Sequence, residues 1–164
     1  MKFKNVFVSF LIAFIFWILI NNSFDPLILG IGAVLSIFLG FLFCSRCDVF
    51  SEIKLTPTAF IYTFIYLAVF FFELIKSNLD VARRVITPSL PINPGIVEVK
   101  TKLKSRMGRM ILANSITLTP GTLTIDIQED TLYIHWIDVK SEEIDEATEI
   151  IVRKFEKYLE KIYG

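Results

Sequence analysis

Apolar residues fill most of the first half of the chain and gather in three long runs. The runs span residues 6–20, 27–44 and 59–75. Helices of these lengths would cover roughly 22–27 Å, close to the ~30 Å hydrocarbon core of a bilayer. We therefore expect about three transmembrane helices. No small-residue cleavage site follows the first run, so we expect an uncleaved anchor and not a signal peptide.

The second and third runs carry surfaces suited to neighbouring helices. Gly30, Gly32 and Gly40 lie in the second run, and small residues allow backbones to approach closely in lipid. The third run is rich in rings, which offer a large surface to lipid or to a partner. These rings are Phe60, Tyr62, Phe64, Tyr66, Phe70, Phe71 and Phe72. Three such segments are too few to enclose a transport path, so we do not expect a channel or carrier that works alone.

The second half of the chain starts with a linker and a strand. Pro88, Pro91 and Pro94 disfavour helix at the residue before each of them and predict an extended linker. Apolar and charged residues then alternate over residues 96–104, which is typical of a half-buried strand with a basic outer face. A short helix is expected over residues 105–112, with Met107, Met110 and Ile111 facing inward.

A hairpin and a final helix complete the pattern. Leu123, Ile125 and Ile127 alternate with polar residues, and after a turn at residues 128–130 the partner strand is expected to bury Leu132, Ile134 and Trp136. Ser141 is expected to cap the last helix. Its apolar stripe, expected to pack on the sheet, consists of Ile144, Ala147, Ile151, Phe155, Tyr158 and Ile162.

The expected fold class is an integral membrane α-helical N-terminal half followed by a small α+β domain of β-α-β-β-α order. We place the transmembrane region, with its juxtamembrane linker, in residues 1–90 and the soluble domain in residues 91–164. A domain of about 70 residues buries little surface, so we expect it to lean on partners or on the membrane for stability.

Composition supports this division. The apolar share is 54%, above the 45–50% that is usual for soluble domains, so the excess belongs in lipid. Of the 34 charged residues only seven precede Glu73. The net charge is zero, which argues against a nucleic-acid partner. A basic block at residues 100–109 and an acidic block at residues 142–149 are solvated faces or two partner surfaces. Abundant Ile, Lys and Glu with one Gln and one His is compatible with a hyperthermophilic source.

The positive charges give conflicting indications of topology. Lys76, Arg83 and Arg84 follow the third run, and the positive-inside rule places them in the cytoplasm. By the same rule, Lys2 and Lys4 place the N-terminus in the cytoplasm. With three spans, the N-terminus and the residues after the third span lie on opposite sides of the membrane, so the two placements conflict. The larger cluster favours a cytoplasmic C-terminal domain with the N-terminus outside.

Three groups of residues are candidates for chemistry. Cys44 and Cys47 form a Cys-x-x-Cys pair, which serves as a dithiol or as half of a metal site, but no second pair completes a zinc site. Glu73 is an ionisable group near membrane depth; an interfacial ion pair with Lys76 and a proton-path carboxylate are both open. Histidine is the residue type that commonly changes charge near neutral pH, but His135 stands alone on its strand and we assign it no chemistry. We expect no catalytic residue, no cofactor, no metal and no enzyme activity.

The most distinctive stretch is the polar segment with Asn114, Ser115, Thr117, Thr119, Pro120 and Gly121, followed by the strand at residues 132–138. Composition alone favours a loop in which Gly121 takes a positive φ. With residues 96–138 as a whole, the segment resembles the E subunit of the Mrp-type multisubunit cation/proton antiporters, the MnhE/MrpE family, and the equivalent subunit of membrane-bound hydrogenases with an antiporter module.

The resemblance implies a function that the residues alone do not give. It implies a non-catalytic accessory subunit of a multisubunit Na+/H+ antiporter in the cell membrane, with the polar segment docking against neighbouring subunits. The expected partners are other integral membrane subunits and membrane lipids, with no nucleic acid and no small-molecule substrate. Alternatives are the same subunit in a hydrogenase-type respiratory complex that couples H2 evolution to ion pumping, a membrane-anchored thiol redox protein, and a lipid-surface sensor using the basic strand.

Overall fold

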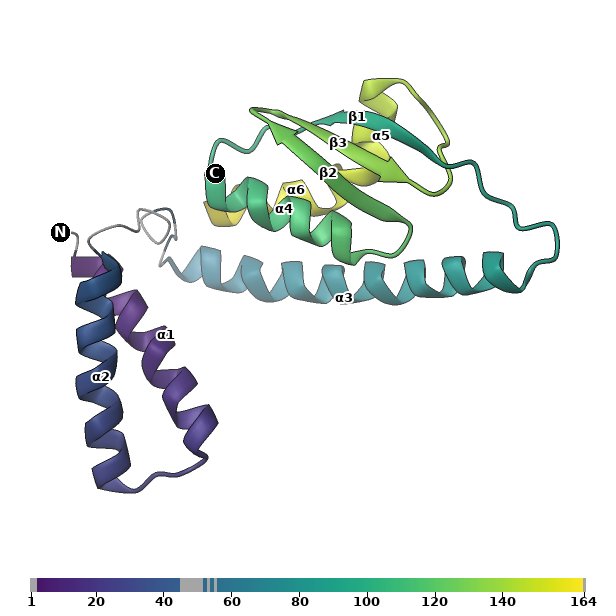
Figure 1. Cartoon of the computed structure of the whole chain (residues 1–164). Coiled ribbons are helices and arrows are strands. Elements are labelled where there is room, and N and C mark those ends of the chain that lie inside the picture. Colours follow the sequence, from purple (N-terminus) through teal and green to yellow (C-terminus); the bar gives the residue numbers. More distant parts are fainter. Residues whose placement is uncertain (1–2, 45–51, 53, 55, 164) are drawn as a thin grey trace. The chain divides into compact units, whose positions relative to one another are not determined.

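The computed structural model describes residues 3–44, 52, 54 and 56–163 (Figure 1). The chain forms two compact units, Met1–Ile53 and Lys54–Gly164. The aromatic third run, which the sequence groups with the membrane region, belongs to the second unit together with the α+β domain.

The first unit is a helical hairpin of α1 (Phe3–Asn21) and α2 (Pro26–Cys44). At 19 residues each, both helices are about 28 Å long. The turn between them is fixed by Asp25, whose Oδ1 accepts a hydrogen bond of 2.8 Å from the backbone N–H of Leu27.

Two of the three glycines of α2 lie where the sequence predicts close helix contact. A Cβ on Gly32 would lie 2.2 Å from Cδ1 of Trp17, and one on Gly40 would lie 3.2 Å from the carbonyl oxygen of Val6. Trp17 is also held by a 3.0 Å hydrogen bond from its indole Nε1 to the carbonyl of Ile28. Gly30 faces open space. Only Gly32 and Gly40 are therefore needed for the packing of α1 on α2.

Helix α3 (Pro57–Ile86) is longer than the predicted span. Thr56 caps its N-terminus by accepting a 3.1 Å hydrogen bond from the backbone of Ala59. The helix ends at Thr87, whose backbone N–H bonds the carbonyl of Arg84 at 3.2 Å. Among the described residues, α3 alone has the length and composition to cross a membrane, while the apolar stretches Asn5–Asn21 and Pro26–Leu42 are shorter. Three transmembrane helices are thus not confirmed.

The rest of the second unit contains a three-stranded antiparallel sheet. Its elements are β1 (Gly95–Lys100), α4 (Arg106–Leu118), β2 (Thr122–Gln128), β3 (Thr131–Trp136), α5 (Ile144–Ile151) and α6 (Arg153–Tyr163). The strand order is β1-β3-β2, with Val97 opposite Ile134 and Leu123 opposite His135. The predicted β-α-β-β-α order is confirmed, with the last helix divided in two.

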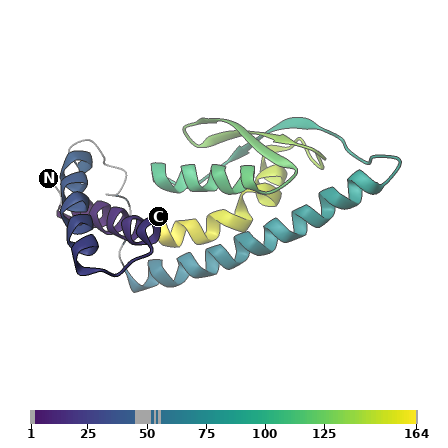
Figure 2. The same cartoon turned by 60° about the horizontal axis from the view of Figure 1, so that its bottom comes forward.

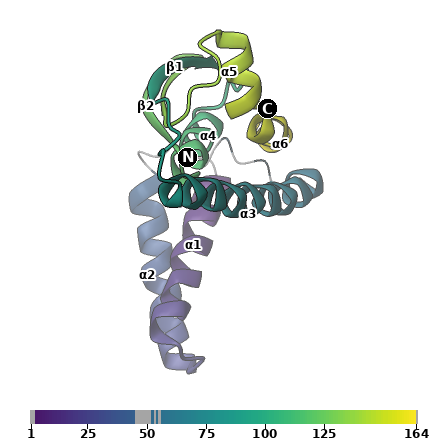
Figure 3. The same cartoon turned by 90° about the vertical axis from the view of Figure 1, so that its right-hand side faces the viewer.

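Helices cover one face of the sheet, as Figure 3 shows for α4, α5 and α6. The side chains that point into this core are fully or nearly buried; those of the sheet are Val97, Val99, Leu132, Ile134 and Trp136. Lys100, Lys102 and Lys104 are exposed, as the alternation predicts. Helices α3 and α6 run side by side (Figure 2), with the rings of Tyr66 and Phe70 each 6.4 Å from that of Phe155.

The apolar side of β2 is not in the core. Leu123, Ile125 and Ile127 are 49%, 52% and 39% exposed, while Thr122 and Thr124 are half-buried. The two threonines turn inward because their hydroxyls bond to carbonyls of α4, at 2.6 Å to Ile116 and 3.1 Å to Ala113. The open face of the sheet is therefore partly apolar.

The final helix also differs from the prediction. It starts at Ile144 and not at Ser141, whose hydroxyl instead accepts a 3.2 Å bond from the backbone of Glu143 outside the helix. It divides at Val152 into α5 and α6. The predicted stripe is buried or half-buried, but only α5 packs beneath β1, whereas α6 packs against α3 and α4. The division lets one stripe serve two different surfaces.

A buried carboxylate fixes the start of α6. Glu156 is 1% exposed, and its Oε1 accepts hydrogen bonds from the Thr101 hydroxyl at 2.5 Å and from the Lys102 backbone at 2.6 Å. Its Oε2 pairs with the guanidinium of Arg153. Because a carboxylate without such partners would be costly to bury, these contacts join α6 firmly to the segment after β1.

Candidate functional site

The polar segment predicted as a loop is mostly helical. Helix α4 continues to Leu118, so Asn114, Ser115 and Thr117 lie on its last turns and the turn proper starts at Thr119. The helix continues because Leu112 and Ile116, one turn apart, are both buried in the core. The predicted helix end at residue 112 is therefore wrong by six residues.

Two of the predicted site residues face the interior. Ser115 is 4% exposed, and its hydroxyl donates to the Ile111 carbonyl at 2.7 Å and bonds the phenol oxygen of Tyr66 on α3. Thr119 is 3% exposed and its hydroxyl donates to the Ser115 carbonyl at 2.7 Å. Since one hydroxyl donates one proton, Tyr66 is the donor in its bond to Ser115. Ser115 therefore joins α4 to α3, while Thr119 bonds the last turn of α4, and both side chains are almost completely covered within the chain.

Thr117 has a different position, at the edge between α4 and β2. It is exposed, and its hydroxyl accepts a 3.1 Å bond from the backbone of Thr124. Thr122 and Thr124, which the sequence did not single out, also join β2 to α4 through hydrogen bonds from their hydroxyls. No sequence spacing predicts these bonds, because they depend on how α4 crosses β2 in the folded structure.

The turn at Pro120 and Gly121 requires glycine, as predicted. Gly121 has φ of 93°, and a Cβ there would lie 3.1 Å from Cγ2 of Ile137 and 3.7 Å from Cγ2 of Val81. Its carbonyl accepts a 2.9 Å bond from the backbone of Ile137. The turn thus approaches α3 and the end of β3 at the same point.

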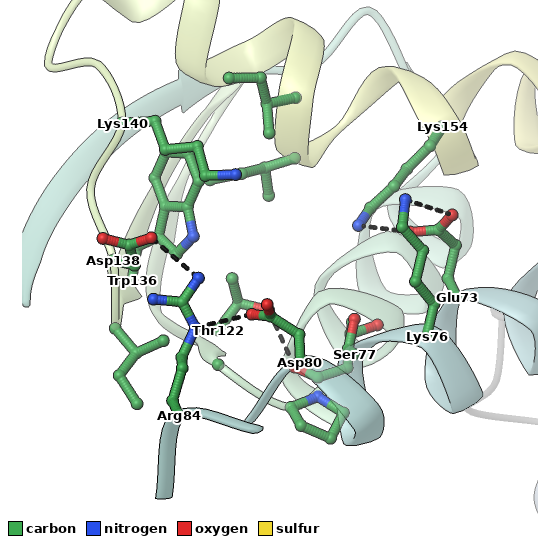
Figure 4. Close-up of a pocket in the computed structure, with 16 residues that line it drawn as sticks. Glu73, Lys76, Ser77, Asp80, Arg84, Thr122, Trp136, Asp138, Lys140 and Lys154 are labelled. Atoms are coloured by element: carbon green, nitrogen blue, oxygen red, sulfur yellow. Dashed lines mark hydrogen bonds and ion pairs between the residues drawn. The ribbon is translucent and has the colours of Figure 1, made fainter. Parts of the chain in front are cut away.

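A charged cavity of about 300 Å3 opens beside this turn, between α3 and the α+β domain (Figure 4). Arg84 of α3 pairs there with Asp80 at 2.7 Å and with Asp138 at 2.9 Å. It also donates to the carbonyl of Pro91 at 2.6 Å. One guanidinium therefore joins α3, the linker and the end of β3.

The other end of the cavity holds Glu73. Its carboxylate lies 3.0 Å from Nζ of Lys154 on α6 and 4.0 Å from Nζ of Lys76. The predicted pair with Lys76 exists, but the shorter contact with Lys154 was not predicted, since 81 residues separate the two in sequence. Glu73 therefore acts as a link between helices, and its role in an ion path stays a hypothesis.

The exposed residues of the polar segment border a shallow groove. Asn114 and Thr117 line it with Ile125, Asp126 and Ile127 of β2, around a volume of about 390 Å3. Hydrogen bonds from the Gln128 amide and from the Ile127 backbone lower the pKa of Asp126. The groove therefore offers amide, hydroxyl, apolar and anionic groups together, which suits a protein partner better than a small ion.

Of the other candidate groups, the structure describes the side chain of His135 only. Cys47 and the side chain of Cys44 fall outside the described residues. His135 is half-buried on β3. In the part of the chain that the structure describes, no three His, Cys, Asp or Glu side chains are grouped as metal ligands are.

Comparison with known proteins gives this arrangement a family. A family model described as a Na+/H+ ion antiporter subunit matches residues 10–162. The chain belongs to this family. The resemblance of the polar segment and the following strand to antiporter E subunits is thereby confirmed.

Antiporter E subunits from two bacteria are similar to the chain along most of their length. The E subunit of the Na+/H+ antiporter of Alkalihalophilus pseudofirmus is 39% identical over 81% of this chain and 83% of that protein. The E1 subunit of the Na+/H+ antiporter of Staphylococcus haemolyticus is 36% identical over 96% of each. A chain in the solved structure of the membrane-bound sulfane sulfur reductase, an archaeal respiratory membrane complex, matches with 42% identity and a TM-score of 0.83, covering 95% of this chain and 97% of that chain.

Proposed function

We propose that the chain is a non-catalytic accessory subunit of a multisubunit Na+/H+ antiporter assembly in the cell membrane. The observation that carries this proposal is the family match over residues 10–162. The groove beside Asn114 and Thr117 supports a subunit that binds other proteins, because it presents polar, apolar and anionic side chains at the surface, whereas the charges of the cavity are paired within the chain. The partners are other integral membrane subunits.

A second candidate is the equivalent subunit of a respiratory complex with an antiporter module. The 42% identity to a chain of an archaeal respiratory membrane complex favours it. The hydrogenase-type complex expected from the sequence is one member of this class. An accessory subunit carries neither the ion path nor a redox centre, so in both candidates the chain would use the same surfaces to bind neighbouring subunits.

The composition of the purified assembly tests both candidates. The chain is extracted in mild detergent from its native membrane, and the mass, subunits and metal content of the complex are measured. Several large hydrophobic partners without iron, nickel or sulfide support the antiporter. The same partners with iron and sulfide, with or without nickel, support the respiratory complex. A monodisperse preparation of this chain alone that transports cations would contradict both.

The groove beside Asn114 gives the docking hypothesis a sharper test. Asn114→Arg places a cation on an exposed helical position, so the α+β domain should unfold at the same temperature as in the original chain. The added bulk and charge in the groove should reduce the amount of co-purified partner subunits at least tenfold. Glu142→Arg, at an exposed position outside α4 and β2, is the control and should retain its partners. Intact co-purification of the Asn114 variant would remove the groove as a docking site.

The cysteine pair separates the accessory subunit from a thiol redox protein. Changing Cys44 and Cys47 together to serine should leave complex assembly and coupled ion movement unchanged, because two thiols make no complete metal site. The measurements are subunit stoichiometry and cation-dependent proton movement in vesicles. Loss of a bound metal or of activity in this double variant would favour the redox alternative.

A further inference from the structure

Helix α3 has two opposite long faces, and they differ completely. Residues spaced by three, four or seven positions fall on one side of a helix. Ala59, Tyr66, Glu73 and Arg84 lie on such a face and pack on the α+β domain or bond to it. The opposite stripe is apolar through the whole helix; it comprises Ile61, Phe64, Ala68, Phe71, Phe72, Ile75, Leu79, Ala82 and Ile86.

The inner face contacts the domain over almost the full length of the helix. Tyr66 bonds Ser115 near one end, Glu73 pairs with Lys154 in the middle, and Arg84 pairs with Asp138 near the other end. From Ala59 to Arg84 the helix rises about 38 Å, more than the ~30 Å hydrocarbon core. A crossing by α3 with these contacts intact would carry the domain into the bilayer.

The α+β domain cannot enter hydrocarbon. It carries most of the charged residues of the chain, including exposed lysines at 100, 102 and 104, and charged side chains are strongly unfavourable at membrane depth. Length and composition make α3 a candidate span, but its contacts require it to stay where the domain can remain in water.

The outer stripe nevertheless needs an apolar environment. Phe64, Phe71, Ile75, Leu79 and Ile86 are 56–80% exposed. They form a straight ridge and not a groove, so a flat lipid surface can cover all of them at once. Large apolar side chains on one face of a helix and charge on the other are typical of helices that lie in the membrane interface.

The charges beside the ridge favour lipid over another protein. Lys76 and Arg83 lie at one edge of the stripe, seven residues apart, and both are exposed. Long basic side chains at this position extend to anionic headgroups while the ridge sits in the acyl region.

We propose that α3 lies in the plane of the cytoplasmic membrane surface with its apolar ridge in the lipid, and that the chain crosses the bilayer only twice, through α1 and α2. The described apolar stretches of these two helices are shorter than that of α3, but each helix has 19 residues in all and its length of about 28 Å nearly matches the ~30 Å hydrocarbon core. An even number of crossings places Lys2 and Lys4 on the same side as Lys76 and Arg83. The conflict in the positive-inside rule, which three spans create, is then removed. The N-terminus and the α+β domain then both lie in the cytoplasm.

Site-specific labelling tests the number of crossings. In the full chain with Cys44 and Cys47 changed to serine, single cysteines are placed directly after Met1, at Ser23 and at Thr131. A membrane-impermeant maleimide is then applied to right-side-out and to inverted vesicles. The N-terminal and Thr131 positions should label at least tenfold more in inverted vesicles, and Ser23 in right-side-out vesicles. Labelling of the N-terminal and Thr131 positions from opposite sides would overturn the two-crossing topology.

Depth measurements test where the ridge lies. A fluorophore is attached to Phe64→Cys, Phe71→Cys or Leu79→Cys, and quenching is compared between lipids with a spin label near the headgroup and lipids with one deep in the acyl chain. All three should be quenched more by the shallow label, and Lys157→Cys, on the exposed side of α6, by neither. Deepest burial at Phe71 alone would indicate a span. No quenching at any of the three in an intact complex would indicate a protein partner, and either result would overturn the proposal. Neither measurement depends on ion transport, so the proposed function stands or falls separately.

Discussion

Replacing Glu156 by alanine should destabilise the α+β domain by about 3–5 kcal/mol, because breaking a buried ion pair leaves its partners unsatisfied. Arg153 would lose its buried carboxylate partner, and the Thr101 hydroxyl and the Lys102 backbone N–H would lose their acceptor. A domain of about 70 residues is stable by only about 4–10 kcal/mol. Chemical denaturation of the full-length chain in detergent, followed by tryptophan fluorescence, measures the change, because Trp136 is 8% exposed in the core.

The matched control for this prediction is Glu149→Ala. Glu149 lies near the same Arg153, at 3.8 Å, but its side chain is 76% exposed. Exposed ion pairs contribute little, typically below about 1 kcal/mol, so the control should unfold almost like the original chain. Equal losses in the two variants would mean that the burial of Glu156 does not determine its contribution.

Phe155→Ala should loosen α3 from the rest of the second unit. Phe155 is fully buried, and both Tyr66 and Phe70 of α3 pack on its ring. Truncating a buried Phe typically costs about 3–5 kcal/mol, and here the cavity would open at the contact between α3 and α6. Hydrogen exchange of the full-length chain should rise at least tenfold in α3 and α6 and much less in the hairpin of β2 and β3.

Phe72→Ala provides the control on the same helix. Phe72 is 66% exposed on the outer ridge, so its truncation leaves the packing of α3 on α6 intact. Exchange in α3 should then stay near that of the original chain. Faster exchange in the Phe72 variant than in the Phe155 variant would show that the outer face, and not the domain, holds α3 in place.

Most elements of the second unit could be predicted from alternation and helical spacing. Val97 and Val99 alternate with charged residues on β1, and the bulky members of the final stripe recur every three or four positions, so the period alone identifies strand and helix. The local pattern does not predict which of the two faces of a strand is buried when either face could be covered. On β2, the period assigns Leu123 and Ile125 to one face but does not state which face α4 will cover.

The ends of the helices were less predictable for a related reason. Four polar residues between 114 and 119 are typical of a turn, because Ser, Thr and Asn compete with the backbone for hydrogen bonds. In the structure Ser115 and Thr119 bond carbonyls within or at the end of the helix, which satisfies them without ending it. The helix continues because Leu112 and Ile116 are buried, and their burial depends on tertiary contacts that the local sequence does not show.

The charged cavity was the least predictable feature. Glu73 and Lys154, or Arg84 and Asp138, are far apart in sequence, and nothing in their local surroundings differs from ordinary surface charge. The apolar character of residues 59–75 also concealed that α3 has one face for protein. Composition measures how apolar a helix is, but only packing reveals which part of it is already covered.

The pairing of α3 with α6 also determines when the chain can finish folding. Helix α6 begins roughly 70 residues after α3 ends, so at ribosomal rates of ~5–20 residues per second α3 waits for several seconds before its inner face is covered. During that interval Glu73 has no Lys154 to pair with, and the rings of Tyr66 and Phe70 have no Phe155 to pack on. Any product that stops before Arg153 therefore keeps the contacts of α3 with Ser115 and Asp138 but leaves the part of its inner face around Tyr66, Phe70 and Glu73 uncovered.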